Sequence, residues 1–272
     1  MRFAVNPDKC VSCLACVRVC PADAVAVDGT SVTIVDEACV RCGLCVPACP
    51  HDAIDTVGDL ARALNFAARG DAVLILSVEA AAHFYPNTPE QVVNACYQSG
   101  FRVVHRGVLG DELVAGEYQK LWADPHWGTM IRSTCPVVVE TIRQEYPELV
   151  PYLAPVKTPV AAEAEYLREM YGAGIPIVYA GVCLADGGAV VEALVTFREL
   201  QQLFDTRGVS VEAQPLYFDR IPEERRRHVS TAGGLPLLVL QESAQASHRF
   251  RKLRGLAALG ALARAVDRKS VV

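Results

Sequence analysis

The sequence lacks the features that mark exported, membrane-spanning and nucleic-acid-binding proteins. No apolar stretch follows Met1-Arg2-Phe3, as a signal peptide would require. The longest charge-free run has 16 residues, Met170 to Ala185, whereas a membrane span needs about 20 apolar ones. The net charge of −5 gives nucleic acid no electrostatic attraction, and neither a Rossmann fingerprint nor a serine-hydrolase elbow occurs. We expect a cytoplasmic protein with no membrane span and no nucleic-acid partner.

Cysteine, by contrast, is abundant, with eleven in 272 residues and eight of them within the first 49. A disulfide framework requires an oxidising compartment, and nothing in the sequence points to export. The count is odd and the cysteines are strongly clustered, so metal ligation is the better explanation. The remaining composition, 51% hydrophobic and 21% charged, fits a folded protein with a small and a larger domain.

The eight clustered cysteines form two runs with the spacing C-x2-C-x2-C-x3-C-P, 29 residues apart: Cys10, Cys13, Cys16 and Cys20, then Cys39, Cys42, Cys45 and Cys49. This pattern resembles bacterial ferredoxins with two 4Fe–4S clusters, in which the fourth cysteine of each run binds the other cluster. The first cluster would then take Cys10, Cys13, Cys16 and Cys49. The second would take Cys39, Cys42, Cys45 and Cys20. Two such clusters would pass single electrons along a line.

Zinc is the alternative metal, but a zinc site does not explain three evenly spaced cysteines and a fourth before proline. His51 follows the second run, and with all eight thiols used we expect it at the surface or beside the cluster rather than as a ligand. Between the runs, residues 25–27 and 32–35 read as two strands around an Asp28-Gly29 turn. These features predict an α+β ferredoxin-like domain at the N-terminus.

After Asp59 the pattern changes to alternating helices and strands. Helical spacing from Leu60 to Gly70 predicts a connecting helix. Strands are then expected at 72–78, 101–104, 130–133, 175–182 and 190–196, and helices at 88–100, 111–121, 137–145 and 159–171. This alternation is typical of an α/β domain with a mainly parallel sheet. The predicted division is 1–58 for the ferredoxin domain, 59–70 for the connecting helix, 71–266 for the α/β domain and 267–272 for a tail.

Two of the three remaining cysteines follow predicted strands. Cys135 lies where the strand at 130–133 meets a helix N-terminus, and Cys183 follows the strand at 175–182. Sites in α/β folds lie at the carboxyl ends of strands, and a helix N-terminus stabilises a thiolate. Cys96 lies in the middle of a predicted apolar helix, and we expect an ordinary buried thiol there.

The larger region resembles the large subunit of di-iron hydrogenases. The resemblance rests on Ser133-Thr134-Cys135-Pro136, on residues 146–149 and 155–159, and on residues 181–185 and 194–200. In that family four cysteines hold a 4Fe–4S cluster, one of which bridges to a di-iron centre with carbonyl and cyanide ligands. The resemblance therefore implies a third cluster with Cys135 and Cys183 among its ligands.

Three departures argue against the di-iron centre. Thr134 stands where active members carry a proton-relaying cysteine, and Asp186 or Gly187 stands where they carry a lysine beside a cyanide. No cysteine follows Cys183, so the family's third motif is missing. Residues 267–272 could be encoded by the start of a common sequencing adapter, which predicts a chain cut short after a basic helix at 250–266. The alternatives are a true loss of the motif and an ordinary basic tail.

We therefore predict an iron–sulfur electron-transfer protein that exchanges electrons with a redox partner protein and relays or senses them near Cys135 and Cys183. One alternative is an enzyme, a di-iron hydrogenase that turns over protons and hydrogen. Another is a structural, partner-binding domain that merely carries a ferredoxin module. In that last case a Cys135→Ser change would leave the iron content unaltered.

Overall fold

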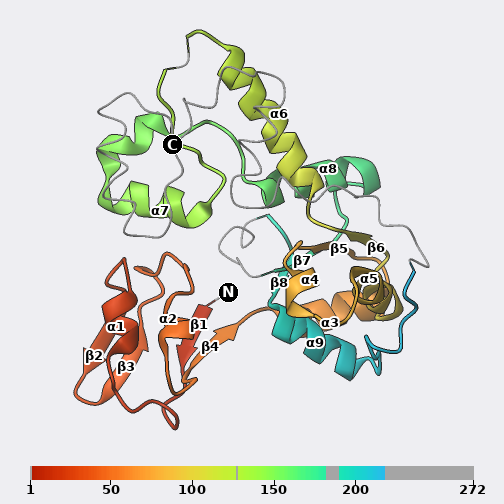
Figure 1. Ribbon diagram of the computed structural model, residues 1–272, viewed down its shortest axis with the longest axis horizontal. Coiled ribbons are helices and arrows are strands. Elements are labelled where there is room, and N and C mark those ends of the chain that lie inside the picture. The colour runs from red at the N-terminus through yellow and green to blue at the C-terminus, as the bar shows by residue number, and fades with distance from the viewer. Residues whose placement is uncertain (1, 127, 182–189, 218–272) are drawn as a thin grey trace.

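The computed structural model describes residues 2–126, 128–181 and 190–217. Its N-terminal unit is a pair of intertwined halves (Figure 1). The elements are β1 (Arg2–Val5), α1 (Ala15–Val19), β2 (Val25–Asp28), β3 (Ser31–Ile34), α2 (Cys45–Ala48) and β4 (Ile54–Val57). β1 pairs with β4 and β2 with β3, both antiparallel, so each small sheet takes one strand from each half. The two cysteine runs are 29 residues apart, and the same spacing separates β1 from β3 and β2 from β4. The two sheets are therefore equivalent under this repeat.

A short joint connects this unit to the rest of the chain. The backbone N–H of Asp59 donates to the carbonyl oxygen of Leu194 at 2.7 Å, and the Asp59 carboxylate accepts the N–H of Leu194 at 3.0 Å. The N–H of Gly58 donates to the Glu199 carboxylate at 2.8 Å, and a Cβ at position 58 would overlap that carboxylate. The joint is therefore fixed against the larger unit rather than being a free linker.

The expected connecting helix is present as α3 (Leu60–Arg69), and it ends at Gly70 in the left-handed conformation that favours glycine. Ala63 and Ala67 on α3 are fully buried in the main hydrophobic core. α3 thus packs as part of the larger unit, and its small side chains allow it to lie close to the sheet.

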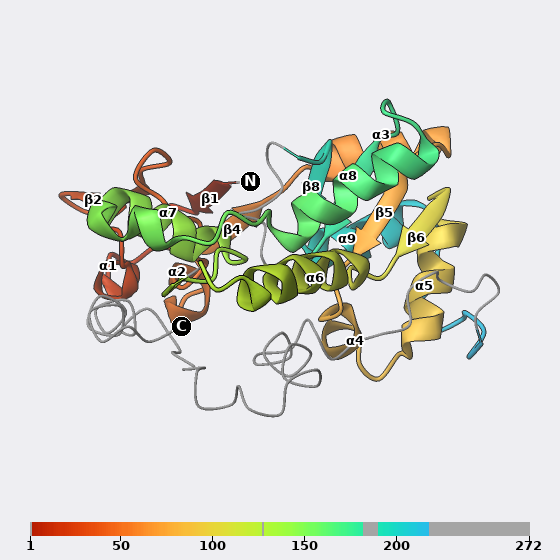
Figure 2. The same ribbon diagram turned by 90° about the horizontal axis from the view of Figure 1, so that it is seen from above.

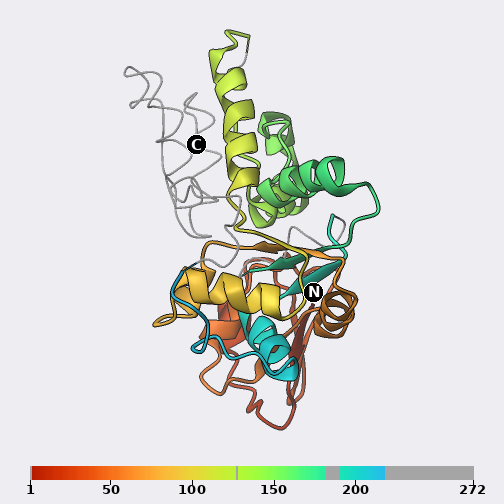
Figure 3. The ribbon, with the colours of Figure 1, turned by 90° about the vertical axis from the view of Figure 1, so that its right-hand side faces the viewer.

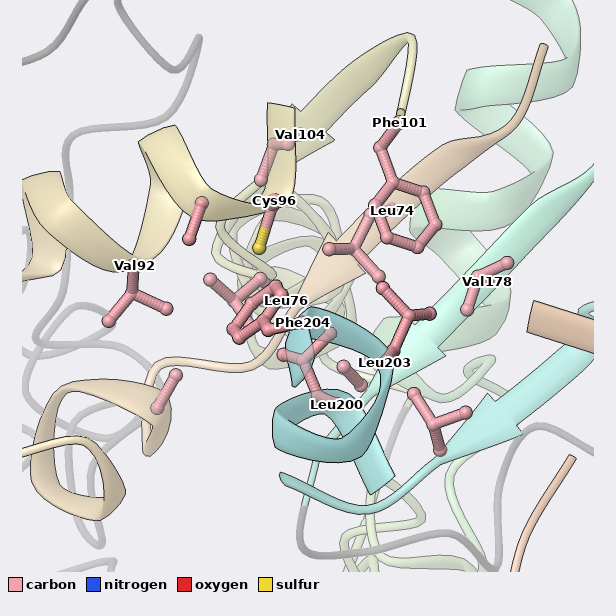
Figure 4. Close-up of a cluster of buried hydrophobic side chains, with 14 of the residues drawn as sticks. Leu74, Leu76, Val92, Cys96, Phe101, Val104, Val178, Leu200, Leu203 and Phe204 are labelled. Atoms are coloured by element: carbon pink, nitrogen blue, oxygen red, sulfur yellow. The ribbon is translucent and has the colours of Figure 1, made fainter. Parts of the chain in front are cut away.

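A four-stranded parallel sheet forms the centre of the larger unit, in the order β6 (Val103–His105), β5 (Val73–Leu76), β7 (Ile177–Ala180) and β8 (Ala193–Val195). Alternate side chains of β5 enter different cores. Leu74 and Leu76 pack with α3, α5 (Pro89–Gln98) and α9 (Phe197–Thr206). Figure 4 shows them beside the side chains of α5 and α9. Val73 and Ile75 pack on the opposite face with α8 (Pro159–Tyr171). The predicted α/β architecture with a parallel sheet is therefore confirmed.

Side-chain caps fix where several helices begin. Thr88 and Gln91 form a reciprocal capping box at α5, where Pro89 takes the first helical position as expected. Thr196 and Glu199 form a second box at α9. Thr158 caps α8, whose bounds match the predicted helix. The remaining described elements are α4 (Ala80–His83), α6 (Leu109–Ala123), α7 (Pro136–Glu145) and the 3-10 helix η1 (Pro147–Tyr152).

The two helices above the sheet, α6 (Leu109–Ala123) and α8, cross closely (Figure 3). A Cβ on Gly110 would overlap the carbonyl oxygen of Pro159. Glu163 on α8 accepts the N–H of Gly110 at 3.1 Å through one carboxylate oxygen. Its other oxygen lies 3.5 Å from Nδ1 of His105, and both side chains are buried. The crossing is therefore held by a backbone contact and a buried polar group.

The prediction of a strand at 130–133 is wrong. Ile131 makes only an isolated bridge to Leu153, with its N–H donating to the carbonyl of Tyr152 and its carbonyl accepting from the N–H of Ala154. The next bond of a ladder would use the N–H of Ser133, but this group donates to the Tyr118 hydroxyl, so the bridge does not extend into a strand. The other strands predicted for the α/β domain are present but shorter, and β6 lies slightly later than expected. The basic helix predicted at 250–266 lies outside the described residues.

Within the described ranges, no helix has the length and apolar character needed to cross a bilayer.

Candidate iron–sulfur sites

The structure brings together the cysteines of each predicted ligand set. One small cavity is lined by Cys10, Cys13, Cys16 and Cys49, and a second by Cys20, Cys39, Cys42 and Cys45. Each cavity thus takes three thiols from one run and the fourth from the other. This exchange follows from the intertwined strand pairing, which places the end of each run beside the start of the other.

The thiols surround a volume instead of converging on a point. Among the described residues, no three Cys, His, Asp or Glu side chains are grouped so as to hold a single metal ion. A 4Fe–4S cluster takes one thiolate at each iron, so its ligands ring the cluster. The donor set of four thiols around each cavity fits such a cluster better than it fits a mononuclear zinc site.

The loops between the cysteines use a left-handed backbone at matched positions. Ser12 and Leu14 have φ of 54° and 61°, and their equivalents Arg41 and Gly43 have φ of 57° and 75°. Alternation of left- and right-handed residues turns backbone N–H groups toward one side, which creates a concave site for an anion. The folded loop therefore supplies amide dipoles to the cavity that the cysteines line.

Backbone amides also reach the fourth cysteine of each run. The N–H of Ala24 donates to Sγ of Cys20 at 3.2 Å, and the N–H of Ala53 donates to Sγ of Cys49 at 3.3 Å. The two contacts are equivalent under the 29-residue shift. Hydrogen bonds to thiolate sulfur stabilise its negative charge and are one of the means by which a protein sets a cluster potential.

Burial opposes ionisation of these thiols while they are metal-free. It raises the pKa of Cys16 and Cys39 and raises the pKa of Cys45 to about 11, and neighbouring thiols add to the increase. A hydrogen bond from the backbone amide of Val17 lowers the pKa of Cys16, and one from the amide of Arg41 lowers that of Cys39. Thiolate is the form that binds metal, so iron binding must displace protons at these sites.

A cleft of about 780 Å³ separates the second cavity from the larger unit. Cys39, Val40 and Arg41 line one side of it, and Ser133 and Pro136 line the other. Figure 2 shows α7 (Pro136–Glu145) passing over the N-terminal unit. Ser133 and Pro136, on either side of Cys135, thus face Cys39 across the cleft, whereas Cys135 itself is not one of the residues that line it.

Cys135 occupies the N-cap position of α7 and is exposed. The expected helix N-terminus is correct, although no strand leads into it. The neighbouring hydroxyl of Thr134 accepts a hydrogen bond from the Arg132 guanidinium. Cys183 lies outside the described residues. Cys96 is fully buried in the main core, and burial strongly raises the pKa of its thiol, in agreement with the expected inert role.

Tyr118 on α6 holds the turn before Cys135 and was not identified from the sequence. Its hydroxyl accepts the N–H of Ser133 at 2.8 Å and lies 3.3 Å from the Ser133 hydroxyl, which donates to the carbonyls of Ala154 and Val156 at 2.7 and 3.0 Å. Burial raises the pKa of Tyr118, so the phenol keeps its proton. An isolated tyrosine on a helix gives no sequence signal for such a role.

Replacing Tyr118 by phenylalanine should lower the free energy of unfolding by about 1–3 kcal/mol, because the buried N–H of Ser133 would lose its acceptor. Tyr152→Phe is the matched control, since that residue is exposed and should change the value by less than about 0.5 kcal/mol. Denaturant unfolding of the two variants beside the wild type measures the difference. Equal midpoints for both variants would show that the Tyr118 hydroxyl does not support the turn.

Known proteins with similar sequences and structures agree with these features. A family model for the C-terminal domain of the iron-only hydrogenase large subunit matches residues 74–269. A model for a 4Fe-4S dicluster domain matches residues 2–50. No protein of curated function matches the chain.

Solved FeFe-hydrogenase structures share the fold at low identity. One, described for oxygen inactivation of its H cluster, has a TM-score of 0.55 at 21% identity and covers 74% of this chain. A second, HydA(deltaEFG), has a TM-score of 0.54 at 21% identity and covers 73%. A variant of HydA1 from Chlamydomonas reinhardtii has a TM-score of 0.52 at 20% identity and also covers 73%. The matched regions span 61%, 60% and 61% of those chains, respectively.

Proposed function

Since the chain belongs to the iron-only hydrogenase large-subunit family, we propose that it is an iron–sulfur electron-transfer protein in which two 4Fe–4S clusters serve a hydrogenase-like domain. The dicluster domain takes residues 1–58 and the hydrogenase-like domain begins near residue 71, after α3. The thiols work in a reducing compartment, which we take to be the cytoplasm.

One observation supports the proposal most directly: Cys39 of the second cysteine set lines the cleft that Ser133 and Pro136 line from the other side. Clusters held by the two cysteine sets would supply one-electron transfer from the first set to the second and across the cleft toward the turn of Cys135. The residues of this chain hold the clusters, orient them through amide hydrogen bonds and limit the access of water. When bound, the clusters supply reversible one-electron chemistry.

We propose that Cys135 and Cys183 are ligands of a third redox group on the far side of the cleft. The exposed position of Cys135 at a helix N-cap supports this role, because the helix dipole stabilises thiolate. The group relays or senses electrons delivered by the dicluster domain.

The second candidate function is hydrogen turnover at a di-iron centre, which membership of the family favours. The engagement of the Thr134 hydroxyl by Arg132 disfavours it, because a hydroxyl that accepts from a guanidinium and has a high pKa is a poor proton relay. We therefore rank electron relay or sensing first.

Iron and sulfide content after anaerobic reconstitution tests the proposal. We expect about twelve irons per chain in the wild type and about eight in Cys135→Ser, with Cys96→Ala as a control that stays at the wild-type level. Eight irons in all three would remove the third site and leave the two-cluster function intact. Far fewer than eight in the wild type would contradict the two-cluster function itself. Hydrogen evolution by the wild type, lost in Cys135→Ser, would establish the second candidate instead.

A further inference from the structure

The two cysteine runs differ at one position between their first and second ligands. Ser12 occupies it in the first run, and its equivalent in the second run is Arg41. Both residues have the same left-handed backbone, with φ of 54° and 57°. The Ser12 hydroxyl donates to the carbonyl oxygen of Thr30. The internal repeat thus offers a controlled comparison, because the same loop position carries a neutral side chain in one half and a positive charge in the other.

Arg41 lies where the second cysteine set meets the cleft. The residue is partly buried, and it lines the cleft on the same side as Cys39, opposite Ser133 and Pro136. In the loop it directly precedes Cys42. A charge that is partly removed from water is screened less than a charge on an open surface. Arg41 is therefore placed to act electrostatically on the group that the second set holds.

The charge of Arg41 reaches a thiol of this set. Burial is the largest influence on the pKa of Cys39 and raises it, whereas the backbone amide and the side-chain charge of Arg41 both act to lower it. The amide belongs to the backbone, so any residue other than proline at position 41 keeps it. The charge belongs to the side chain alone. A substitution at this position therefore separates the two contributions.

The other charged side chains close to the two loops are more exposed. Lys9 and Arg18 beside the first set are exposed, and so are Asp36 and Glu37, which line the cleft with Arg41. Water and salt screen exposed charges strongly. Of these five side chains, Arg41 has the charge that solvent screens least.

We propose that Arg41 raises the reduction potential at the second cysteine set and so holds electrons beside the cleft, an inference that rests on the proposed electron-transfer function. One-electron reduction adds one negative charge within the ring of thiolates, and the guanidinium stabilises that charge. Transfer of one electron from the first set to the second becomes more favourable. One cluster is oxidised by one electron, the other is reduced by one electron, and no bond forms or breaks. Arg41 is a positioning residue in this role, because it is not a ligand.

A redox titration of the reconstituted protein, followed by electron paramagnetic resonance, tests this role. Arg41→Ser copies the neutral residue that the first loop carries in the same backbone conformation. Arg41→Gln removes the charge from a longer side chain and serves if the serine variant binds less iron. Arg41→Lys keeps the charge. Arg143→Ser is the matched control, since it removes an exposed cation of α7 that lines the same cleft.

We expect the loss of the charge to change the equilibrium of the one-electron transfer by a factor of about 3–10 in Arg41→Ser and Arg41→Gln. For a one-electron couple this change makes one reduction potential more negative by about 30–60 mV. The sign follows because the reduced, more negative state loses its stabilising cation. The remaining potentials should not move, and Arg41→Lys and Arg143→Ser should match the wild type.

The other outcomes separate the role of Arg41 from the two-cluster function. Unchanged potentials in variants with the iron content of the wild type would overturn the role while leaving the clusters in place. Equal shifts in Arg41→Lys and Arg41→Ser would assign the effect to side-chain shape and would also overturn it, as would an equal shift in Arg143→Ser. A wild type that binds no iron would overturn the proposed function itself.

Discussion

A variant in which Cys10 and Cys20 are both alanine will lose both clusters, whereas a variant in which Cys20 and Cys39 are alanine will keep one. Each variant lacks two thiols, so the number of ligands removed is the same. In a Cys135→Ser background, which removes the proposed third site, the iron content after reconstitution should be close to zero in the first case and about four per chain in the second. Iron and sulfide analysis of the two proteins side by side gives the result.

The reason lies in how the cavities are built. Cys10 lines the first cavity and Cys20 the second, so the first variant damages both sites. Cys20 and Cys39 line the same cavity, and their combined loss leaves the other four thiols intact. The mirror pair, Cys49 with Cys10, should behave like the second variant. If each run instead held its own cluster, the two double variants would exchange their iron contents.

A Gly110→Ala substitution should destabilise the protein by about 3 kcal/mol, the upper part of the usual range for overpacking. The added methyl group would overlap the carbonyl oxygen of Pro159, which is backbone and cannot rotate away. Helices α6 and α8 would have to separate, and the hydrogen bond from the N–H of Gly110 to Glu163 would lengthen. Thermal unfolding should show a melting temperature lower by about 6–12 °C for a protein of this size.

Gly116→Ala on the same helix is the matched control. A Cβ there meets no atom within 4 Å, so only the backbone entropy changes, and the substitution should stabilise the helix by up to about 1 kcal/mol. The two substitutions are chemically identical and should have opposite signs. A Gly110→Ala protein as stable as Gly116→Ala would show that the two helices do not depend on the close approach.

The sequence was most informative where a short pattern repeats. The cysteine spacing predicted both the ligand sets that the cavities bring together and, through the 29-residue shift, the equivalence of the two halves. The helices expected at 88–100 and 159–171 and the strand expected at 72–78 are present as α5, α8 and β5, because caps and apolar runs depend on residues close in the chain.

Contacts between distant residues could not be predicted in this way. The segment at 130–133 has strand-like residues, but Ser133 gives its hydrogen bonds to Tyr118 and to two carbonyls more than 20 residues away. α9 was not predicted, although the Thr196–Glu199 capping box is visible in the sequence and could have revealed it. The cleft beside the second cysteine set depends on how two units meet, which no local pattern encodes.

The joint at Asp59 has a consequence for self-association. β8 is an outer strand of the sheet, and such a strand presents N–H and carbonyl groups that can recruit a strand from another molecule. Asp59 occupies these groups at Leu194, the central residue of β8, with its own N–H and its carboxylate. The same residues that position the cluster-binding unit therefore shield the sheet edge from forming intermolecular β-structure. A fragment that begins after the joint would keep the sheet but lose this protection, and it would be prone to aggregate through β8.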